Sequence, residues 1–305
     1  MRVIYRFVAA GLLSLLLLVS GARAEDASVL VLGRISDDPK AHYQQLKPLL
    51  DYVIPRMHSV GVREGRILMA RDAQQMSSYL RRGHVDWVTE TTGAAMALAQ
   101  RAGARPLLLT ERNGARSYHS VVFVRRDSAL RSLADLRGRS LALQNLGSTS
   151  AYVVPLMDLL DAGLRPELLL TPTDKPVNDN VGYVLARTEL NISTYVHKGL
   201  TDAGVVSSID WASPNAMPPA FRRDFRIVHE SAPYPRAVEM VRADLSPAVR
   251  KRLQEVLLEA SADPVAGPAL QAFFGTSGFH RVDAASQRRF DGIKAGLARI
   301  WAVVE

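Results

Sequence analysis

Leu141-Ala142-Leu143-Gln144-Asn145-Leu146-Gly147-Ser148-Thr149-Ser150-Ala151-Tyr152 is the stretch from which the fold can be worked out. Its first three residues are apolar and predict the end of a buried strand, after which Gly147 permits a tight turn. The apolar residues that follow recur at the spacing of one helical face, and they are Val153, Leu156, Met157 and Leu160. The stretch therefore predicts a strand, a turn and a helix that ends at Gly163.

Ser148, Thr149 and Ser150, here called the hydroxyl turn, form a candidate anion-binding site together with Gly147. The first N–H groups of a helix have no partner inside the helix, and the aligned peptide dipoles place about half a positive charge there. The alternative is that Ser148 or Thr149 only caps the helix, which stabilises it by about 1 kcal/mol without any ligand. Pro155 requires either a separate first turn or a kinked axis.

Residues 1–24 have the pattern of a secretory signal peptide. Arg2 and Arg6 flank a charged start, Phe7–Val19 is almost wholly apolar, and Ala22-Arg23-Ala24 matches the small-x-small pattern before a cleavage site. The apolar run is shorter than the about 20 residues of a membrane span, and an uncleaved anchor is the alternative. We therefore expect a soluble protein that is exported to the periplasm and begins near Glu25.

Composition narrows the possible functions. The chain has no cysteine, which excludes a lipoprotein anchor, a disulfide, a thiol nucleophile and a cysteine metal site. Three of the 38 basic residues lie in the expected signal, so 35 remain against 30 acidic residues, a net charge of +5. The basic residues are scattered, which disfavours nucleic-acid binding but allows small anions to be attracted. A chain of 305 residues can fill one large core or two medium ones.

Strands and helices alternate along the first half of the chain. Val29–Gly33, Ile67–Ala70 and Val85–Val88 are predicted strands, and residues 41–57 and 73–82 are predicted helices. Such alternation predicts a parallel sheet whose ligands collect at the carboxyl edge of the strands. Glu90 and Thr91 follow the third strand and are therefore candidate ligand contacts.

The second half continues the pattern less regularly. The predicted strands are Tyr118–Val124, Ala203–Ser207, Phe225–Val228 and Ala237–Arg242. The predicted helices are residues 132–138, 191–198, 247–261 and 284–304. Leu168–Tyr183 is polar and interrupted by proline, which predicts a loop.

Four motifs, read in order, resemble the periplasmic phosphate/phosphite/phosphonate-binding proteins of ABC transporters. They are Tyr118–Ser128, Ser132–Gly138, Gly147–Tyr152 and Asp202–Ser208. The resemblance implies an α/β type II periplasmic binding protein fold with two lobes, each a mostly parallel sheet flanked by helices. Two extended crossovers near 118–122 and 228–237 would join lobe one (25–117 plus 232–305) to lobe two (118–231).

The resemblance also implies a function. It is that of a monomeric, exported solute-binding protein of an ABC-type uptake system, which clamps a small oxyanion between the lobes and delivers it to a permease. In that family the hydroxyl turn holds the phosphorus oxyanion, which would place Ser148, Thr149 and Ser150 on the ligand. Tyr43 falls near a ligand-contacting aromatic residue of the family, but a tyrosine on a helix face is as often part of the core.

Two departures from the family pattern leave the ligand open. After the third strand, the family usually has an apolar-Gly-Pro loop that contains a tyrosine, whereas this chain has Thr89–Ala95. The phosphonate binders also have a histidine about ten residues before the glycine that matches Gly199, whereas this chain has Glu189-Leu190-Asn191 there. If Glu90 points into the cleft, its charge would repel a dianion unless the ligand also carries a cation, as an aminophosphonate or another zwitterion does. The alternative is that Glu90 caps the next helix or lies in solvent.

Four further residues are candidates to shape the site. Tyr118 and His119 precede a buried strand near the first crossover, and Asn191 and Asp210 lie near the presumed ligand edge of lobe two. The alternatives are hydrogen-bonded packing for His119 and capping of a turn for Asp210. Arg116 is a possible charge partner, or a surface arginine.

Catalysis is not expected. Gly147–Ala151 lacks the Gly-x-Ser-x-Gly pattern of a hydrolase, and the sequence has no HExxH motif or Walker loop. The seven histidines are dispersed and have no metal-ligand spacing, so we expect neither a metal nor a cofactor. A liganded protein that docks on a membrane histidine kinase would use the same clamp, so transport and sensing both stay open.

Overall fold

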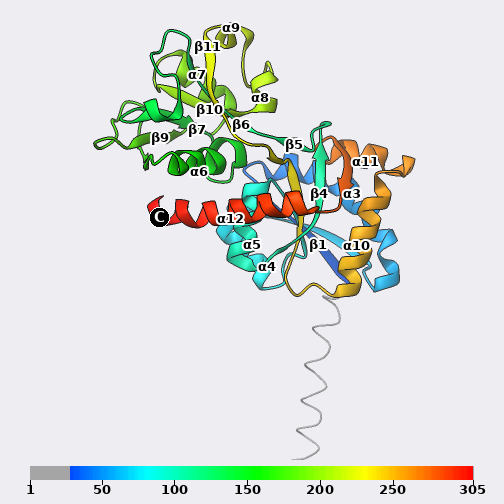
Figure 1. Cartoon of the computed structure of the whole chain (residues 1–305). Coiled ribbons are helices and arrows are strands. Elements are labelled where there is room, and N and C mark those ends of the chain that lie inside the picture. Colours follow the sequence, from blue (N-terminus) through cyan, green and yellow to red (C-terminus); the bar gives the residue numbers. More distant parts are fainter. Residues whose placement is uncertain (1–27, 305) are drawn as a thin grey trace, which may run out of the picture.

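Six strands of the computed structural model, which describes residues 28–304, form a first sheet in the order β14-β4-β13-β3-β1-β2. They are β1 (Val29–Ile35), β2 (Glu64–Ala70), β3 (Trp87–Glu90), β4 (Arg105–Arg112), β13 (Ala237–Val241) and β14 (Thr276–His280). The flanking helices are α3 (Pro39–Arg56), α4 (Ala73–Arg81), α5 (Thr92–Ala102), α10 (Pro247–Ala260) and α11 (Gly267–Ala272), with short turns η1 (His58–Val60) and η4 (Pro264–Ala266). We call this half lobe one (Figure 1). The expected signal peptide, residues 1–24, lies outside the described residues.

Strand directions in lobe one bring four strand ends to one edge. β1 pairs in parallel with β2 and β3, whereas β13 runs antiparallel to both β3 and β4. The carboxyl ends of β1, β3 and β4 therefore share an edge with the amino end of β13. In α/β sheets this is the edge at which ligands bind.

A second six-stranded sheet, in the order β11-β6-β10-β7-β9-β8, forms lobe two. Its strands are β6 (Ser120–Arg125), β7 (Ser140–Leu143), β8 (Pro166–Leu168), β9 (Val181–Leu185), β10 (Ala203–Ser207) and β11 (Phe225–Glu230). Its helices and helical turns are η2 (Leu133–Leu136), η3 (Thr149–Val153), α6 (Val154–Asp161), α7 (Glu189–His197), α8 (Ser208–Ala212) and α9 (Pro219–Arg223). β6 runs antiparallel to β10 and β11, so this sheet is mixed, like the first.

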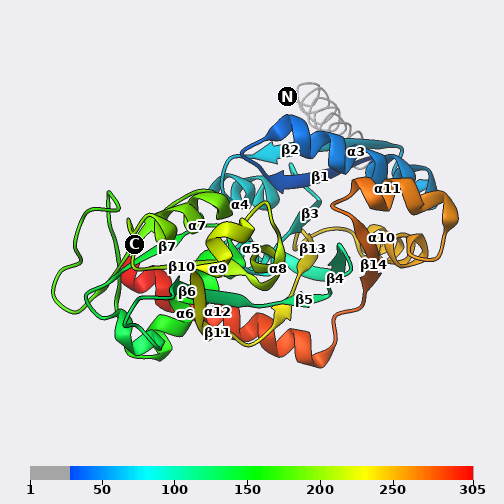
Figure 2. The same ribbon diagram turned by 90° about the horizontal axis from the view of Figure 1, so that it is seen from above.

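Two short strands join the lobes. β5 (Ser117–Tyr118) and β12 (Tyr234–Pro235) pair antiparallel, and their tyrosine rings meet edge to face with centroids 4.7 Å apart. Seen from above, the two connections pass between the lobes (Figure 2). This arrangement confirms the predicted two-lobed α/β fold with paired crossovers. The predicted boundaries at 117/118 and 231/232 stay predictions.

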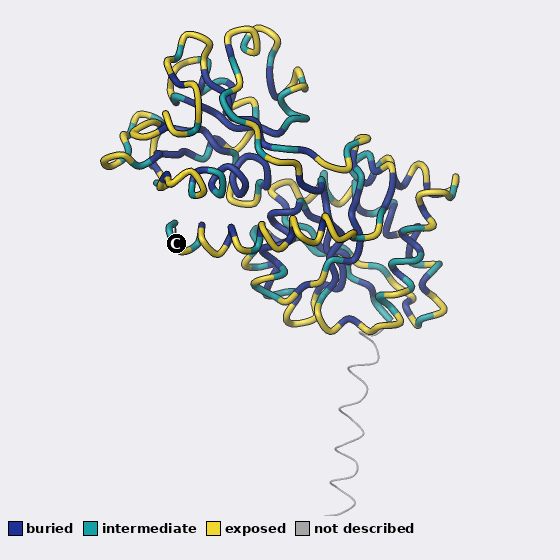
Figure 3. The backbone as a smooth tube through the Cα atoms, in the orientation of Figure 1, coloured by how far each residue is buried: buried dark blue, intermediate teal, exposed yellow. Residues whose placement is uncertain are grey.

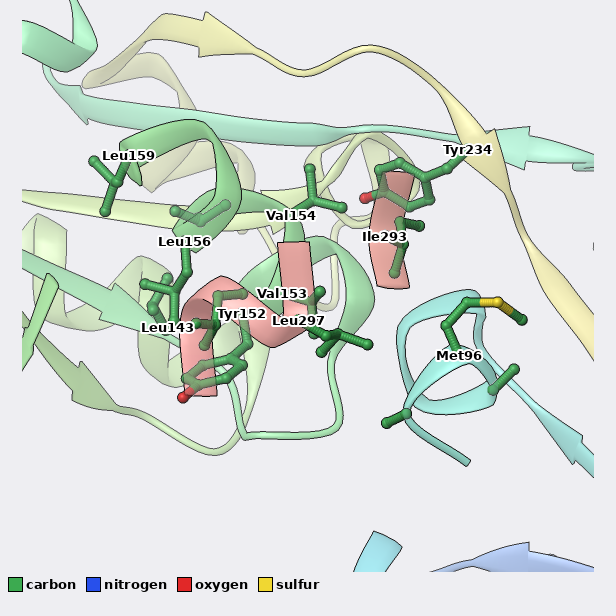
Figure 4. Packing of buried hydrophobic residues seen from close by; sticks show 14 of the residues in the cluster. Met96, Leu143, Tyr152, Val153, Val154, Leu156, Leu159, Tyr234, Ile293 and Leu297 are labelled. Atoms are coloured by element: carbon green, nitrogen blue, oxygen red, sulfur yellow. The ribbon is translucent and has the colours of Figure 1, made fainter. Parts of the chain in front are cut away.

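The C-terminal helix α12 (Ala284–Val304) contacts both lobes. It packs against α5 of lobe one and against α6 and β8 of lobe two (Figure 1). One continuous hydrophobic cluster results, in which side chains of α5, η3, α6 and α12 meet (Figure 4). Gly296 allows the close approach of α12 to α6, because a Cβ at this position would lie 2.4 Å from Sδ of Met157.

A second hydrophobic cluster belongs to lobe one alone and lies between α3, α10, α11 and the sheet. Asp38 is the N-cap of α3 and its carboxylate accepts the N–H of Ala41, while Pro39 is the first residue of the helix. The face of α3 that carries Leu46, Leu50 and Val53 is fully buried. The buried strands of each lobe are enclosed by more exposed helices and loops (Figure 3). Burial of each such side chain stabilises the fold by about 1.5–3 kcal/mol.

Two local predictions are decided by the structure. Pro155 lies in the first turn of α6, and η3 precedes it as a separate turn with Ala151 at non-helical backbone angles, so the separate-turn alternative holds. The segment Leu168–Tyr183, expected to be a loop, includes the start of β9, a central strand. The prediction was wrong at that end because Gly182 interrupts the apolar run. Across residues 28–304, no helix has the length and apolarity needed to cross a membrane.

Candidate ligand-binding site

The hydroxyl turn lies where lobe two meets the N-terminus of α5 in lobe one. Oγ1 of Thr149 accepts the N–H of Gly93 at 2.7 Å, and Thr149 is only 1 % exposed. The absence of a side chain on Gly93 permits this approach, because a Cβ there would lie 3.0 Å from Oγ1 of Thr149. The turn thus faces another helix N-terminus across the junction of the two lobes.

The other members of the turn already have protein partners. Ser148 is the N-cap of η3 and accepts the N–H of Ala151 at 3.1 Å, as the capping alternative predicted. Ser150 is buried and hydrogen-bonded to the hydroxyl of Tyr234. Gly147 is exposed, and its N–H donates to Oδ1 of Asn145 at 3.0 Å. An oxyanion at this turn would therefore have to compete with existing hydrogen bonds.

Glu90 is buried at the end of β3. Its Oε1 accepts the N–H of Ile35 at 2.8 Å, and its Oε2 lies 3.9 Å from Nη1 of Arg34. Glu90 is therefore neither a helix cap nor a solvent-exposed residue, which corrects the alternative weighed above. The next residue, Thr91, is the N-cap of α5 without a side-chain hydrogen bond to the helix, and it lines a pocket.

That pocket has a volume of about 440 Å³ and is lined by three arginines. Arg34 stands near the carboxyl end of β1, Arg112 ends β4, and Arg236 immediately precedes β13. All three lie at the edge of lobe one described above, because strand direction brings these ends together. We call this set, together with His42 and Gln45 of α3, the arginine pocket.

Arg112 is the most deeply placed member, at 3 % exposed. Its Nη2 donates to Oγ1 of Thr89 at 2.6 Å. Burial and the neighbouring charge of Arg34 lower the pKa of Arg112 to about 9, so the group still carries its charge at neutral pH. The guanidinium groups of Arg34 and Arg112 each lie 4.4 Å from the ring centroid of Phe274, which holds both of them by cation–π contact.

Glu239 of β13 supplies a buried negative charge behind Arg112. It is 0 % exposed, and its carboxylate accepts hydrogen bonds from Trp87 (2.6 Å), Thr89 (2.7 Å) and Thr110 (2.6 Å). Thr89 thus connects the guanidinium to the carboxylate. Burial raises the pKa of Glu239, and the charge of Arg112 acts in the opposite direction.

The facing edge of lobe two carries carboxylates. Asp210 follows β10 and accepts the hydroxyl of Ser207 at 2.5 Å, and Glu189 begins α7 and accepts from Nε2 of Gln144 at 2.6 Å. Burial and the nearby charge of Asp210 raise the pKa of Glu189, while Arg236 of lobe one acts in the opposite direction. The edge of lobe two is therefore acidic where it is close to the arginines of lobe one.

Of the four remaining candidate residues, only Tyr118 lies beside the arginine pocket. Tyr118 is buried, and the guanidinium of Arg236 lies 4.8 Å from its ring centroid, so Tyr118 borders the arginine pocket. Tyr43 is 47 % exposed on α3 and does not line that pocket. His119 faces Glu230, with 3.1 Å between Nε2 and Oε1. Asn191 is exposed and donates to the carbonyl oxygen of Ala186 at 2.8 Å.

The arginine pocket was not predicted from the sequence, and Arg116 was considered as the charge partner of the ligand instead. Arg116 is exposed and lies 3.7 Å from Glu111 in an ion pair. A partial signal existed, because Arg34 directly follows the apolar run Val29–Gly33, although Thr110 and Glu111 separate Arg112 from the apolar run Leu107–Leu109. It could not be used for Arg112 or Arg236 without the sheet order, which places the ends of β4 and β13 beside that of β1.

Comparisons with known proteins agree with this architecture. The family described as the periplasmic substrate-binding protein of the phosphonate ABC transporter matches residues 33–287. Structures of XAC2383 from Xanthomonas citri, one bound to chloride ion and one bound to ATP, are 57 % identical in sequence and have a TM-score of 0.87, covering 91 % of this chain and 100 % of that one. PhnD1 from Prochlorococcus marinus in complex with methylphosphonate is 15 % identical, with a TM-score of 0.63 and coverage of 90 % and 100 %, and supports the fold alone.

These matches confirm the predicted family and fold class, and they agree with the expectation that the protein is not an enzyme. The family match spans both lobes and both connections between them. This chain therefore belongs to the periplasmic substrate-binding proteins of phosphonate ABC transporters.

Proposed function

We propose that this chain is an exported solute-binding protein that clamps a small oxyanion of the phosphonate, phosphite or phosphate type between its two lobes. The observation that carries the proposal is the hydrogen bond between Gly93 of lobe one and Thr149 of lobe two. It brings the N-termini of α5 and η3 together, and both attract negative charge.

An oxyanion at this junction has a specific way to bind. Thr149 acts as the acceptor in its bond with Gly93, which leaves the proton of the Thr149 hydroxyl to donate to a ligand. An oxyanion could also replace Thr149 as the acceptor for the N–H of Gly93. Hydrogen bonds to charged acceptors are about twice as strong as neutral ones, so the exchange favours the anion.

The ligands of similar proteins support an anionic solute. XAC2383 was solved with chloride ion and with ATP, and PhnD1 with methylphosphonate. All three ligands are anions. For the present chain we propose an anion of the phosphonate, phosphite or phosphate type, which a monomer delivers to the permease of an ABC transporter.

Export fits the same role. We propose that residues 1–24 are removed as a signal peptide and that the mature protein works in the periplasm without a lipid anchor, since the chain has no cysteine. We also propose residues 25–117 plus 232–305 as lobe one and residues 118–231 as lobe two. The paired strands β5 and β12 lie close to both boundaries and would act as the hinge.

A zwitterionic ligand is the second candidate. It is favoured by Glu189 and Asp210, which place negative charge on the edge of lobe two near Arg236. An aminophosphonate would direct its amine to these carboxylates and its oxyanion to the hydroxyl turn, which would remove the repulsion expected for a simple dianion.

The test is a calorimetric and thermal-shift screen of the mature protein with phosphate, phosphite, methylphosphonate, 2-aminoethylphosphonate, sulfate and acetate. A ligand that binds only the folded form raises the melting temperature. We expect a phosphorus oxyanion to bind and Thr149→Ala to weaken it by about 1–3 kcal/mol. Thr171→Ala, at an exposed loop of lobe two, is the matched control. Equal affinity in wild type and Thr149→Ala would remove the hydroxyl turn from the site.

A further inference from the structure

We propose that the arginine pocket is a second anion-binding subsite, formed by lobe one alone, that takes a phosphoryl group of a larger molecule. Three guanidinium groups, from Arg34, Arg112 and Arg236, line it. The inference goes beyond the proposed function, because the hydroxyl turn does not line this pocket.

The subsite does not depend on closure of the lobes. Every residue that lines it lies between residues 34 and 113 or between residues 236 and 275, in the helices and strands of lobe one or directly beside them. The three arginines are fixed by the ends of β1, β4 and β13 in one sheet. An anion can therefore bind here before the two lobes engage the rest of a ligand.

Unused hydrogen-bond donors point to a missing partner. The Nε atoms of Arg34, Arg112 and Arg236 are all buried, and none has a hydrogen-bond partner among residues 28–304. Arg112 is more than nine-tenths buried, and within the same residues neither Arg112 nor Arg236 takes part in an ion pair. Buried donors of this kind are costly unless they are satisfied, and an oxyanion is the acceptor that guanidinium groups bind best.

The charges of the pocket also favour an anion. Three guanidinium groups face two buried carboxylates, Glu90 at 3.9 Å from Arg34 and Glu239 behind Thr89. His42 adds little positive charge at neutral pH, because burial and the charge of Arg34 lower the pKa of its imidazole. Arg112 is buried, and the attraction between a buried charge and an anion is stronger than the same attraction in water.

Phe274 holds the arginines ready for a ligand. Its ring contacts the guanidinium groups of both Arg34 and Arg112 at 4.4 Å, and its backbone has a φ of 56°, in the left-handed region that residues other than glycine seldom adopt. Backbone strain of this kind is concentrated at ligand-binding sites. Prior placement of the guanidinium groups reduces the entropy lost on binding.

The size and shape of the pocket define the ligand class. Guanidinium groups from three separate strand ends suit the several oxygens of a tetrahedral phosphoryl group better than the two of a carboxylate. The volume of about 440 Å³ falls in the range of pockets that hold whole small molecules, so it leaves space for more than the phosphoryl group. Gln45 also lines the pocket, and its Oε1 is buried without a partner among the described residues. It is placed to accept a hydrogen bond from the part of the ligand that is not the phosphoryl group.

The test is isothermal titration of the mature protein with pyrophosphate, and with acetate for comparison. We expect pyrophosphate to bind and acetate not to bind. Arg34→Gln and Arg236→Gln should each weaken pyrophosphate by about tenfold or more, the effect of losing one charge-assisted hydrogen bond. Arg116→Gln is the matched control, since it removes the same charge from an exposed residue outside the pocket. Arg112→Gln is avoided because Arg112 is buried and its hydrogen bond to Thr89 also supports the fold.

The outcomes separate this inference from the proposed function. Thr149→Ala should leave pyrophosphate affinity within about twofold while it weakens methylphosphonate. The inference is overturned if wild type does not bind pyrophosphate, if Arg116→Gln weakens it as much as Arg34→Gln does, or if both arginine variants bind as wild type does. If wild type binds pyrophosphate but none of methylphosphonate, phosphite and phosphate, the proposed function is overturned and the subsite stands.

Discussion

The backbone N–H of Gly93 and the hydroxyl oxygen of Thr149 are joined by a hydrogen bond of 2.7 Å that crosses from one lobe to the other. Both residues are buried, and Oγ1 of Thr149 would touch any side chain added to Gly93. The contact therefore links the start of α5 directly to the hydroxyl turn, and it is a point where ligand binding and lobe contact affect each other.

Thr149→Ala should destabilise the ligand-free protein by about 1–3 kcal/mol, because it leaves the buried N–H of Gly93 without an acceptor. Urea unfolding measures the change. Thr149→Ser retains the hydroxyl and should recover most of the loss. An alanine variant as stable as wild type would show that the contact contributes nothing to the lobe junction.

Gly296→Ala should destabilise the protein by about 1–3 kcal/mol, the usual cost of overpacking, because the new Cβ would lie 2.4 Å from Sδ of Met157 and press α12 away from α6. Gly292→Ala on the same helix is the matched control. A Cβ there has no neighbour within 4 Å, and alanine favours the helix by about 1 kcal/mol. Thermal unfolding that changes equally in the two variants would contradict the role of α12 as a brace between the lobes.

Stability should depend on pH through His42. Burial and Arg34 lower its pKa below the usual 6.5, so the unfolded chain binds a proton more readily than the folded protein does. The contribution of His42 is present above about pH 6.5 and is lost as the pH falls toward the lowered pKa of the folded state. Unfolding at pH 5.0 and 7.5 should show a smaller difference for His42→Gln than for wild type. Identical differences would exclude His42 as the cause.

Anion binding should in turn raise the pKa of His42. The imidazole borders the arginine pocket, where a bound anion would offset the repulsion from Arg34. By linkage, pyrophosphate should bind more tightly to wild type at pH 5.5 than at pH 7.5, after correction for the protonation of pyrophosphate itself. The His42→Gln variant should lose that excess, as measured by titration calorimetry at both pH values.

Much of the fold could be predicted from sequence, because the deciding signals are local. The apolar runs of β1, β7 and β10 and the periodicity of α3 and α12 identify these elements on their own. β9 was not predicted, because it contains a glycine and follows a polar segment, so the sequence has no continuous apolar run there. The strand is buried because β7 and β8 pair with it on either side. Sheet order is a property of long-range pairing, which periodicity does not report.

The candidate site was only partly predictable for the same reason. The hydroxyl turn is one contiguous motif, and its place at the lobe junction agrees with the sequence-based expectation. Its role in holding a ligand stays a prediction. The arginine pocket draws on residues as distant as Arg34 and Arg236, which only the sheet order brings together. Glu90 was predicted as a ligand contact, with a helix cap or a surface residue as the alternative, because nothing local shows that it accepts the N–H of Ile35 on the adjacent strand.

A crystal structure of the mature protein grown with methylphosphonate tests the central proposal most directly. We expect the phosphonate between the two lobes, with its oxygens within hydrogen-bond distance of Oγ1 of Thr149 and of the N–H of Gly93. A phosphonate bound elsewhere, with the bond between Gly93 and Thr149 intact and no ligand at the hydroxyl turn, would contradict it.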